Sequence, residues 1–426
     1  MVRRLFTYAI IVIAAALTRC LAVDTATGIM SPRFATLQVY ANDNVLNDAV
    51  IRLGDDDSRL TVEFDEIADD VRYMRYSLIH CNADWQPSQL VDSEFLDGFN
   101  EGTVDDYEFS RATTVHYVHY RINIPGESMR PLVSGNYLLR VYDEGEPDIT
   151  LLQARFMVTE QAVTLSSQVS SVTDVDYNDA HQQLSMELDA SNLTVHDPFN
   201  DFKVVVTQNN RTDTRRTLLH PLRMHGSRLV YEHQPELVFP AGNEYRRFEN
   251  ISTHSPSMHV EGVAYHGPYY HAYIEPDSQR ATVPYTYDRT QNGRYVVREY
   301  NSTRPDTEAD YLVTHFTLFS DPLPGTEIYL EGDLTNRRLD AGSRLTYDPE
   351  LGAYTITRLL KQGSYNYMYL AVPSSAPARG TAVPSATSAI EGDFYNTVNK
   401  YDIAIYHRLP GQRYDRLVGY FTVYSL

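Results

Sequence analysis

The sequence predicts an all-β protein built from tandem antiparallel β-sandwich domains. Short segments in which apolar and polar residues alternate recur about every ten residues, and clusters of Gly, Pro, Asn and Asp separate them. Tyrosine is abundant, with 33 residues against 15 Phe and 1 Trp, and its ring favours half-buried strands. Little of the chain has helical periodicity. Regularly spaced strands with turn signals between them are typical of a sandwich.

Length and charge set the broad class of the protein. The chain has 426 residues, which at roughly 100–200 residues per domain corresponds to two to four domains. Its formal net charge is -20 and its pI is near 5.1. Such a chain is repelled by the phosphates of nucleic acid, so we expect no nucleic-acid partner.

The N-terminus has the pattern of a secretion signal. Arg3 and Arg4 precede an apolar run at residues 5–18, and small residues lead to a cleavage point after Ala22. These features predict a signal peptide over residues 1–22. No later run is long and apolar enough for a membrane-spanning helix, so we expect an exported protein that does not itself span the bilayer.

The two cysteines raise the question of lipidation and of a disulfide. Cys20 follows the letters LTR, a loose match to a lipoprotein signal, but Arg19 occupies a position that normally holds a small residue. A lipid anchor at Cys20 is therefore an alternative to ordinary cleavage. After cleavage behind Ala22, Cys81 is the only cysteine left, which excludes an intramolecular disulfide.

Three β domains are expected after the signal peptide. The first is predicted over residues 30–160, with strands in ATLQVYA, SRLTVEF, MRYSLIHC, TVHYVHYRINI, GNYLLRVY and QARFMVT. A middle β domain is predicted at 161–302 and a C-terminal sandwich at 310–426, with the polar segment NSTRPDTEAD between them. The C-terminal domain carries a stretch of Pro, Ala, Ser, Thr and Gly at 373–389, which predicts a flexible loop.

Groups that could carry chemistry are few. His80 and Cys81 are adjacent in a predicted strand, where neighbouring side chains point to opposite faces and cannot act as base and nucleophile. The same geometry separates His116 from His119, so we expect no zinc site formed by these two and His80. The acidic run at 53–70 lacks the spacing of a helical calcium loop. The sequence therefore predicts no catalytic residue, no cofactor, no metal and no enzyme.

The C-terminal block is similar to early-set immunoglobulin-like modules, a group that includes glycogen- and starch-binding domains. The similarity lies in TEIYLEGDLTNRR, GAYTITRLL and KQGSYNYMYLAV. In those modules a Trp just after Gly-Asp usually stacks on the sugar, whereas this chain has Asn336, Arg337 and Arg338 there. A periplasmic or surface carbohydrate-binding protein is the alternative function that this similarity leaves open.

A resemblance to one family covers nearly the whole chain from about residue 31 to residue 421. The chain resembles the type IX secretion system plug proteins of Bacteroidetes in the segments YSLIHCNADWQPSQL, TVHYVHYRINIP, SGNYLLRVY, FPAGNEYRRFE, LLKQGSYNYMYL and EGDFYNTVNKYDIAIYHRLPGQRYDRLVGYF. Asn82 stands where an Asp is expected, and Ala112 where an Asn is expected.

This resemblance implies a non-catalytic periplasmic protein on the inner side of the outer membrane. It would dock on the giant translocon β-barrel of the secretion system and block its pore when cargo is absent. Loop tips at 100–108 and 373–389 are the expected contact sites, because loops on β scaffolds often carry function.

The most characteristic motif residues are expected to be structural. For the first of these motifs we expect a strand that places His80 and Cys81 on opposite faces, a turn at 82–84, and Trp85 as the core anchor of the first domain. The full set of family-motif residues is His80, Cys81, Asp84, Trp85, Gly98, His119, Tyr120, Gly135, Asn136, Tyr137, Gly242, Asn243, Gly363, Tyr365, Glu391, Gly392, Tyr414 and Asp415.

Overall fold

A computed structural model of the chain describes residues 24–126, 129–375 and 385–425. The predicted signal peptide with Cys20 and the central part of the 373–389 loop lie outside these residues. Within the described residues, none of the helices has the length and apolar character required to cross a membrane. The fold is all-β, as predicted, with many antiparallel sheets packed as sandwiches.

The first sandwich pairs two antiparallel sheets around one apolar core. Strands and helices of this unit are β1 (Gly28–Ile29), β2 (Phe34–Ala41), β3 (Val50–Arg52), β4 (Leu60–Glu66), β5 (Met74–Cys81), α2 (Asp92–Phe95), β6 (Leu96–Gly98), β7 (Gly102–Thr103), β8 (Asp106–Phe109), β9 (Val118–Ile124), β10 (Met129–Pro131), β11 (Gly135–Asp143) and β12 (Glu146–Thr159). One sheet has the order β1-β12-β11-β5-β7, with β3 beside β12, and the other β2-β4-β9-β8. Its core matches the alternating apolar positions of the predicted strands.

The second sandwich combines strands from the middle of the chain with the two last strands. Its elements are β13 (Thr164–Ser170), β14 (His181–Asp189), β15 (Phe202–Gln208), η1 (Thr212–Thr214), β16 (Arg216–Leu218), β17 (Arg223–His225), β18 (Arg228–Tyr231), η2 (Pro235–Leu237), β19 (Val238–Pro240), β30 (Lys400–His407) and β31 (Arg416–Tyr424). β30 pairs antiparallel with β15 and with β31. Both late strands contribute to the same core as β14 and β15.

The third sandwich is inserted between β19 and β30. Its elements are β20 (Arg246–Glu249), β21 (Val260–His266), β22 (Tyr269–Ile274), β23 (Asp277–Ser278), β24 (Tyr295–Val297), α3 (Pro305–Glu308), β25 (Tyr311–Phe319), β26 (Thr326–Glu331), η3 (Asp333–Thr335), β27 (Thr346–Asp348), β28 (Ala353–Lys361) and β29 (Gly363–Pro373). The long strand β29 pairs with β20, β24 and β26. The other sheet has the order β21-β22-β25-β28-β27.

These pairings correct the expected boundaries at 161–302 and 310–426. β20 to β24 were expected in the middle domain but belong to the core of the third sandwich. β30 and β31 were expected in the C-terminal domain but complete the second. The physical reason is a long-range strand pairing. Strand β15 would have an unpaired edge without β30, which follows about 200 residues later in the chain. β30 also adds apolar side chains to the core that holds Val204 and Val206 of β15.

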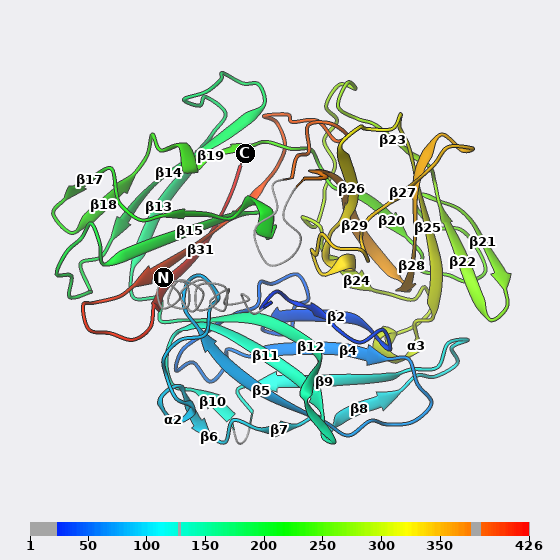
Figure 1. Cartoon of the computed structure of the whole chain (residues 1–426), viewed down its shortest axis with the longest axis horizontal. Coiled ribbons are helices and arrows are strands. Elements are labelled where there is room, and N and C mark those ends of the chain that lie inside the picture. The colour runs from blue at the N-terminus through cyan, green and yellow to red at the C-terminus, as the bar shows by residue number, and fades with distance from the viewer. Residues whose placement is uncertain (1–23, 127–128, 376–384, 426) are drawn as a thin grey trace, which may run out of the picture.

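The three sandwiches form a triangle. In Figure 1 the second and third sandwiches lie next to each other above the first, and the red C-terminal strand β31 runs within the green second sandwich. Hydrogen bonds join each pair of sandwiches, so the junctions bring together residues distant in sequence. Several family-motif residues and the buried charges gather at these junctions. The junctions are therefore the candidate functional region.

Candidate functional site at the junctions of the three sandwiches

The junction between the first and third sandwiches is centred on the buried carboxylate of Asp65 in β4. Its Oδ2 accepts hydrogen bonds from Lys361 Nζ at 2.6 Å and from the Tyr311 hydroxyl at 2.6 Å. Its Oδ1 lies 2.7 Å from His119 Nδ1. Burial opposes the charge, but the charges and hydrogen bonds of Lys361 and His119 outweigh it and hold the pKa of Asp65 below its usual value.

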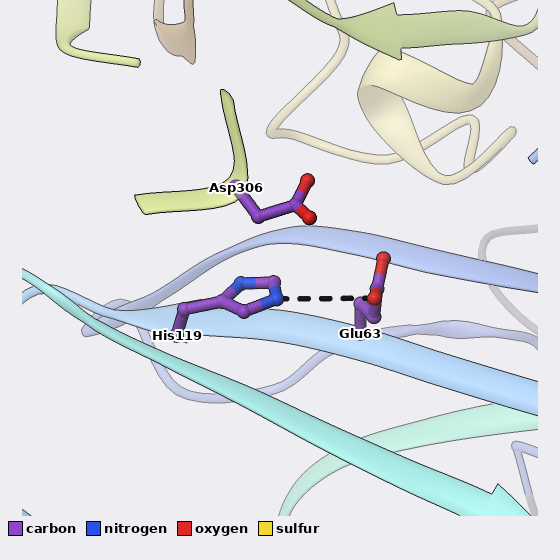
Figure 2. A group of neighbouring side chains, drawn as sticks. All are labelled: Glu63, His119 and Asp306. Carbon is purple, nitrogen blue, oxygen red and sulfur yellow. Dashed lines mark ion pairs between the residues drawn. The ribbon is translucent and has the colours of Figure 1, made fainter. Parts of the chain in front are cut away.

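His119 is held in its charged form by this junction. Burial would lower its pKa, but the hydrogen bond to Asp65 and the contact with Glu63 raise it to about 9. Figure 2 shows His119 facing Glu63, with the Asp306 carboxylate of helix α3 above and between them. The Nε2 atom lies 3.9 Å from Glu63 Oε1. The hydrogen bond to Asp65 accounts for Nδ1, whereas the buried Nε2 has only this longer contact to Glu63 and no hydrogen bond among the described residues.

Glu63, His119 and Asp306 are close enough to suggest a metal site. Their surroundings disfavour that reading. Arg121 lies 2.6 Å from Glu63 Oε1 and 3.7 Å from Asp306 Oδ2, so a guanidinium already neutralises both carboxylates. A metal ligand must also be a neutral imidazole, whereas His119 carries a proton near neutral pH. The group is an ion-pair network between two sandwiches.

A loop of the first sandwich docks on the same side of the third. The backbone N–H groups of Thr114 and Val115 donate to the Asp310 carboxylate at 2.7 and 3.0 Å. The hydroxyl of Tyr117 donates to the carbonyl of Ala309 at 2.8 Å. Lys361 Nζ lies 4.1 Å from the centre of the Tyr117 ring, so its charge also has an aromatic contact.

The junction between the first and second sandwiches is formed by the turn after β5. The Ala83 N–H donates to Asp415 Oδ2 at 3.1 Å, and the Asp415 N–H donates to Asn82 Oδ1 at 3.2 Å. Asn136 closes the contact, because its amide donates to the Asn82 carbonyl and accepts from the Tyr406 hydroxyl. The motif around residue 82 is thus an interdomain joint built mainly from hydrogen bonds.

His80 and Cys81 lie beside this joint and are both buried. His80 Nδ1 is 2.8 Å from Ser88 Oγ and Nε2 is 3.2 Å from the Ser134 carbonyl, so both nitrogens have partners. Burial lowers the pKa of His80 to about 4. Burial raises the pKa of the Cys81 thiol to about 12, which is the opposite of what a nucleophilic cysteine needs.

Trp85 departs from its expected role as a core anchor. It is half-buried, is not part of the first sandwich's core, and has a left-handed backbone with φ of 64°. The guanidinium of Arg155 lies 4.4 Å from the centre of its ring. The chain leaves strand β5 at the turn formed by residues 82–84. This turn places the Trp85 indole outside the sheet, where it lines a cavity.

That cavity, of about 480 Å³, lies where all three sandwiches meet. Asp48 of the first sandwich contributes to its wall and pairs with Lys400 of the second at 2.6 Å and with Arg294 of the third at 2.5 Å. Burial opposes the charge on Asp48, but Lys400 and Arg294 hold its pKa well below the usual value. Burial and the neighbouring Asp48 raise the pKa of Asp402, which shares Lys400. One carboxylate therefore ties three units together.

Glu391, whose carboxylate is fully buried, lies in the segment between β29 and β30 and is held by the third sandwich. It accepts from Arg280 Nη2 at 2.6 Å, from Arg246 Nε at 3.1 Å and from the Tyr369 N–H at 2.9 Å. Its backbone carbonyl accepts from Asn243 Nδ2 at 2.7 Å. These contacts fix the segment that returns the chain from the third sandwich to β30.

The remaining family-motif residues lie within single sandwiches or beside these junctions. Four glycines have positive φ, and a Cβ at Gly135 would lie 2.5 Å from His80 Nε2. Asp84 is exposed and caps its own turn through the Gln86 N–H. The structure places the others as follows: Gly98 ends β6, Tyr120 and Tyr137 lie in the first core, Gly242 and Gly392 flank the Glu391 segment, Gly363 and Tyr365 start β29, and Tyr414 packs on His80.

Sequence reasoning missed the charged residues that make the junctions. The chain contains three lysines, Lys203, Lys361 and Lys400, and each pairs with a carboxylate at a junction. Lys203 supports Asp415, the acceptor for Ala83. The available signal was the scarcity of lysine beside 33 arginines, together with the apolar strand sequence around each lysine.

The sugar-binding position of early-set modules has another use here. Arg337, which follows Gly332–Asp333, is buried and pairs with Glu331 Oε1 at 2.9 Å and Asp333 Oδ1 at 2.6 Å. Its guanidinium also donates to the carbonyls of Asn209 and Asn292. This arginine ties the second and third sandwiches and presents no aromatic face for stacking on a sugar.

The two loops expected at the tips differ in how much of them is described. At 100–108, Asn100 is anchored by two hydrogen bonds to the backbone of Leu78. Phe99 next to it is 78% exposed, and Tyr107 and Phe109 of β8 are 43% and 47% exposed. In the loop at 373–389, the described residues Ser385 and Ala386 contact Asp213 and Ala371, while residues 376–384 lie outside the description.

Comparisons with known proteins identify relatives. Residues 34–160 match the family model of the type 9 secretion system plug protein 1st domain. A crystal structure of a hypothetical protein from Parabacteroides merdae superposes with a TM-score of 0.91 at 41% identity, covering 95% of this chain and 100% of that one. None of the curated proteins matches.

Two further solved structures superpose poorly. An alkylpurine DNA glycosylase from Pseudomonas fluorescens has a TM-score of 0.17 at 14% identity, over 30% of each chain. The BSP domain of a biofilm associated protein has a TM-score of 0.20 at 10% identity, over 94% of this chain and 60% of that one. Neither bears on the fold. The first sandwich, which holds the motif around residue 82, matches the plug protein 1st domain, and this match supports the type IX secretion system plug protein family for the chain.

Proposed function

We propose that this protein docks on the periplasmic side of the type IX translocon β-barrel and blocks its pore when no cargo is passing. The match to the plug family supports a role in type IX secretion. Docking and pore blocking are our inference from that match and from the build of the molecule. The protein would act in the periplasm at the inner side of the outer membrane, without catalysing a reaction.

The observation that carries the proposal is the set of buried charges between the sandwiches. Asp65 and Asp48 each bind cationic side chains across domain boundaries, and the buried Arg337 of the third sandwich donates to the Asn209 carbonyl of the second. Domains in contact through small polar interfaces move relative to one another by default. Buried ion pairs resist such motion, because separating them leaves uncompensated charge in a medium of low polarity. A stopper for a wide pore needs a body that keeps its shape in this way.

We place the docking surface around Phe99, Tyr107 and Phe109 of the first sandwich. Aromatic side chains are enriched at the centre of protein interfaces, and contiguous exposed apolar groups mark interaction sites. Tyr107 and Phe109 touch edge to face with ring centroids 6.0 Å apart, and β8 is an edge strand of its sheet. A partner that binds reversibly would bury these rings in an interface that is smaller and less hydrophobic than an obligate one. The loop at 373–389 is the second proposed contact.

Affinity purification of the tagged protein from gently solubilised outer membranes tests docking. We expect one very large barrel protein to be recovered with the wild type and to be lost with the Phe99→Asp, Tyr107→Ser double variant. Tyr265→Ser is the matched control, since Tyr265 is 57% exposed on the third sandwich. Recovery of the barrel with the double variant would remove this surface from the proposal. No recovery with the wild type would overturn docking itself.

Pore blocking has its own test in cells. Deleting the gene should make the outer membrane permeable to antibiotics that are normally too large to enter. Wild-type protein should restore the barrier, and the non-docking double variant should not. Unchanged permeability after deletion, in cells that keep secreting, would contradict the stopper function while leaving the docking result intact.

A further inference from the structure

Three histidines gather on the outer face of the third sandwich. His271 in β22 and His315 in β25 are in direct contact, with His271 Nδ1 only 2.8 Å from His315 Nε2. Their rings stack with centroids 5.1 Å apart and planes at 18°. His266, at the end of β21, meets His271 edge to face with centroids 5.1 Å apart. Imidazoles from three strands thus share one small area.

Strand alternation turns this group away from the core. Ala272 and Ile274 of β22 and Phe316 of β25 lie in the core of the third sandwich. Residues that alternate with them, including His271, Tyr273 and His315, therefore point to the opposite face. His271 and His315 are partly exposed and His266 is exposed. The group is accessible to a small solute from solvent.

The contacts of these histidines are mainly to other imidazoles. Four further exposed or partly exposed histidines pair with a carboxylate: His116 with Asp69, His181 with Asp176, His233 with Asp174 and His259 with Glu275. Among the described residues, His271 and His315 instead face other histidines and Thr357. Burial and the nearby imidazoles lower the pKa of both. In the part of the chain that the structure describes, no carboxylate pairs with either imidazole.

The hydrogen-bond pattern fits one neutral arrangement. The Thr357 hydroxyl lies 3.2 Å from His315 Nδ1 and can donate to it. His315 Nε2–H then donates to His271 Nδ1, which assigns the tautomers by their partners. Only one proton lies between the two imidazoles, and no carboxylate holds it there. A cation that binds both nitrogens can take the place of that proton.

We propose that His271 and His315 form a two-imidazole binding site for a late first-row divalent metal ion such as Zn²⁺, with His266 packed beside His271 at its edge. Imidazole is a preferred ligand of zinc, copper and nickel. Two imidazoles on one tetrahedral zinc, with Zn–N bonds of about 2.0–2.1 Å, have their nitrogens about 3.3 Å apart. The pair must therefore open by roughly half an ångström, within reach of small side-chain rotations. On binding, the proton of His315 moves from Nε2 to Nδ1, which then donates to the Thr357 hydroxyl, so both imidazoles remain neutral ligands.

This site differs from the Glu63, His119 and Asp306 group in its local charge. There, Arg121 occupies the space between the carboxylates and His119 is protonated. At His271 and His315, the contacts that the structure shows are to neutral groups. Tyr273 stacks flat on His315 with centroids 4.7 Å apart, which limits rotation of that ring and orients it toward His271. The proposal does not depend on docking to the translocon.

Calorimetric titration of the metal-free protein with Zn²⁺ is the direct test. We expect one ion to bind per chain, and His271→Gln or His315→Gln to weaken binding by about tenfold or more because each removes one of two strong ligands. His266→Gln should weaken it less. His233→Gln is the matched control, since that exposed histidine pairs with Asp174, and it should leave the affinity unchanged.

Copper provides a second readout that does not rely on affinity. With Cu²⁺ in place of Zn²⁺, electron paramagnetic resonance should show coupling to at least two imidazole nitrogens in the wild type and to one fewer in each single variant. Equal Zn²⁺ binding by wild type, His271→Gln and His315→Gln would overturn the proposal. So would a wild-type protein that binds no Zn²⁺ at all.

Discussion

His80 and His119 lie on neighbouring sheets of the first sandwich, both are buried, and their pKa values move in opposite directions. His80 sits beside the junction with the second sandwich, where burial lowers its pKa to about 4. His119 sits at the junction with the third, where two carboxylates outweigh burial and raise its pKa to about 9. The junction with the second sandwich is therefore built mainly from hydrogen bonds, including those of the Asp415 carboxylate, and the junction with the third from ion pairs buried on both sides.

This difference predicts that mutations at the two junctions lower the free energy of unfolding by different amounts. A buried hydrogen bond between neutral groups contributes about 0.5–1.5 kcal/mol to stability, whereas breaking a buried ion pair leaves a charge that cannot be solvated. At the junction with the second sandwich, Asp415 binds the Ala83 N–H, and Lys203, which pairs with it, keeps its side chain 37% exposed. At the junction with the third, both Asp65 and Lys361 are almost fully buried. Loss of one partner should therefore destabilise the protein more at the junction with the third sandwich than at the junction with the second.

The largest effect is expected for Lys361→Met. It leaves Asp65 buried without its ammonium partner, and we expect a loss of about 3–5 kcal/mol in the free energy of unfolding. Denaturant titration measures it. Adding Asp65→Asn to Lys361→Met should recover part of the loss, because the uncompensated charge disappears. A loss below about 1 kcal/mol for the single variant would show that this junction does not depend on charge.

The two histidines should give opposite pH dependence. The folded pKa of His119 is raised, so its contribution is complete below about pH 6.5 and is lost as pH rises through about 9. The folded pKa of His80 is lowered, so its contribution is complete above about pH 6.5 and is lost as pH falls through about 4. A full shift of this size corresponds to about 3 kcal/mol.

Unfolding titrations from pH 4 to pH 9 on wild type, His119→Gln and His80→Gln separate the two contributions. His119→Gln should flatten the alkaline decline only, and His80→Gln should flatten part of the acid decline only. If both variants kept the wild-type profile at both ends, the contrast between the junctions would be lost.

A smaller effect is expected for Asp415→Ala at the junction between the first and second sandwiches. It removes the acceptor for the Ala83 N–H and should cost about 2 kcal/mol, since Lys203 can turn to solvent. Denaturant titration beside Lys361→Met gives the comparison directly. A cost equal to that of Lys361→Met would mean that both junctions rely on buried charge.

The smallest expected effect is on the alkylation rate of Cys81, which lies beside the junction between the first and second sandwiches. Its thiol is fully buried and its pKa is raised to about 12, so native protein should react with iodoacetamide far more slowly than protein unfolded in guanidinium chloride. Mass spectrometry follows the labelling. Rapid labelling of the native protein would indicate that the joint after β5 opens readily, contrary to its hydrogen bonding.

The sequence predicted the fold class and most strands because alternation is a local property. The pairing of β15 with β30 is not local, so the insertion of the third sandwich into the second was missed. Among site residues, the strand that holds His80 and Cys81 could be predicted from local alternation, and β5 contains both. Trp85 was misplaced, since a turn redirects it, and the role of Lys361 could not be inferred because its partner Asp65 lies about 300 residues away.

The three lysines have a practical consequence. Proteases that cut after lysine and reagents that acylate amines find side-chain targets in this chain only at Lys203, Lys361 and Lys400. The ammonium groups of Lys361 and Lys400 are almost entirely covered by interdomain contacts. Cleavage or acylation at those two positions would therefore require the sandwiches to separate. The rate of either reaction measures how often the domains come apart.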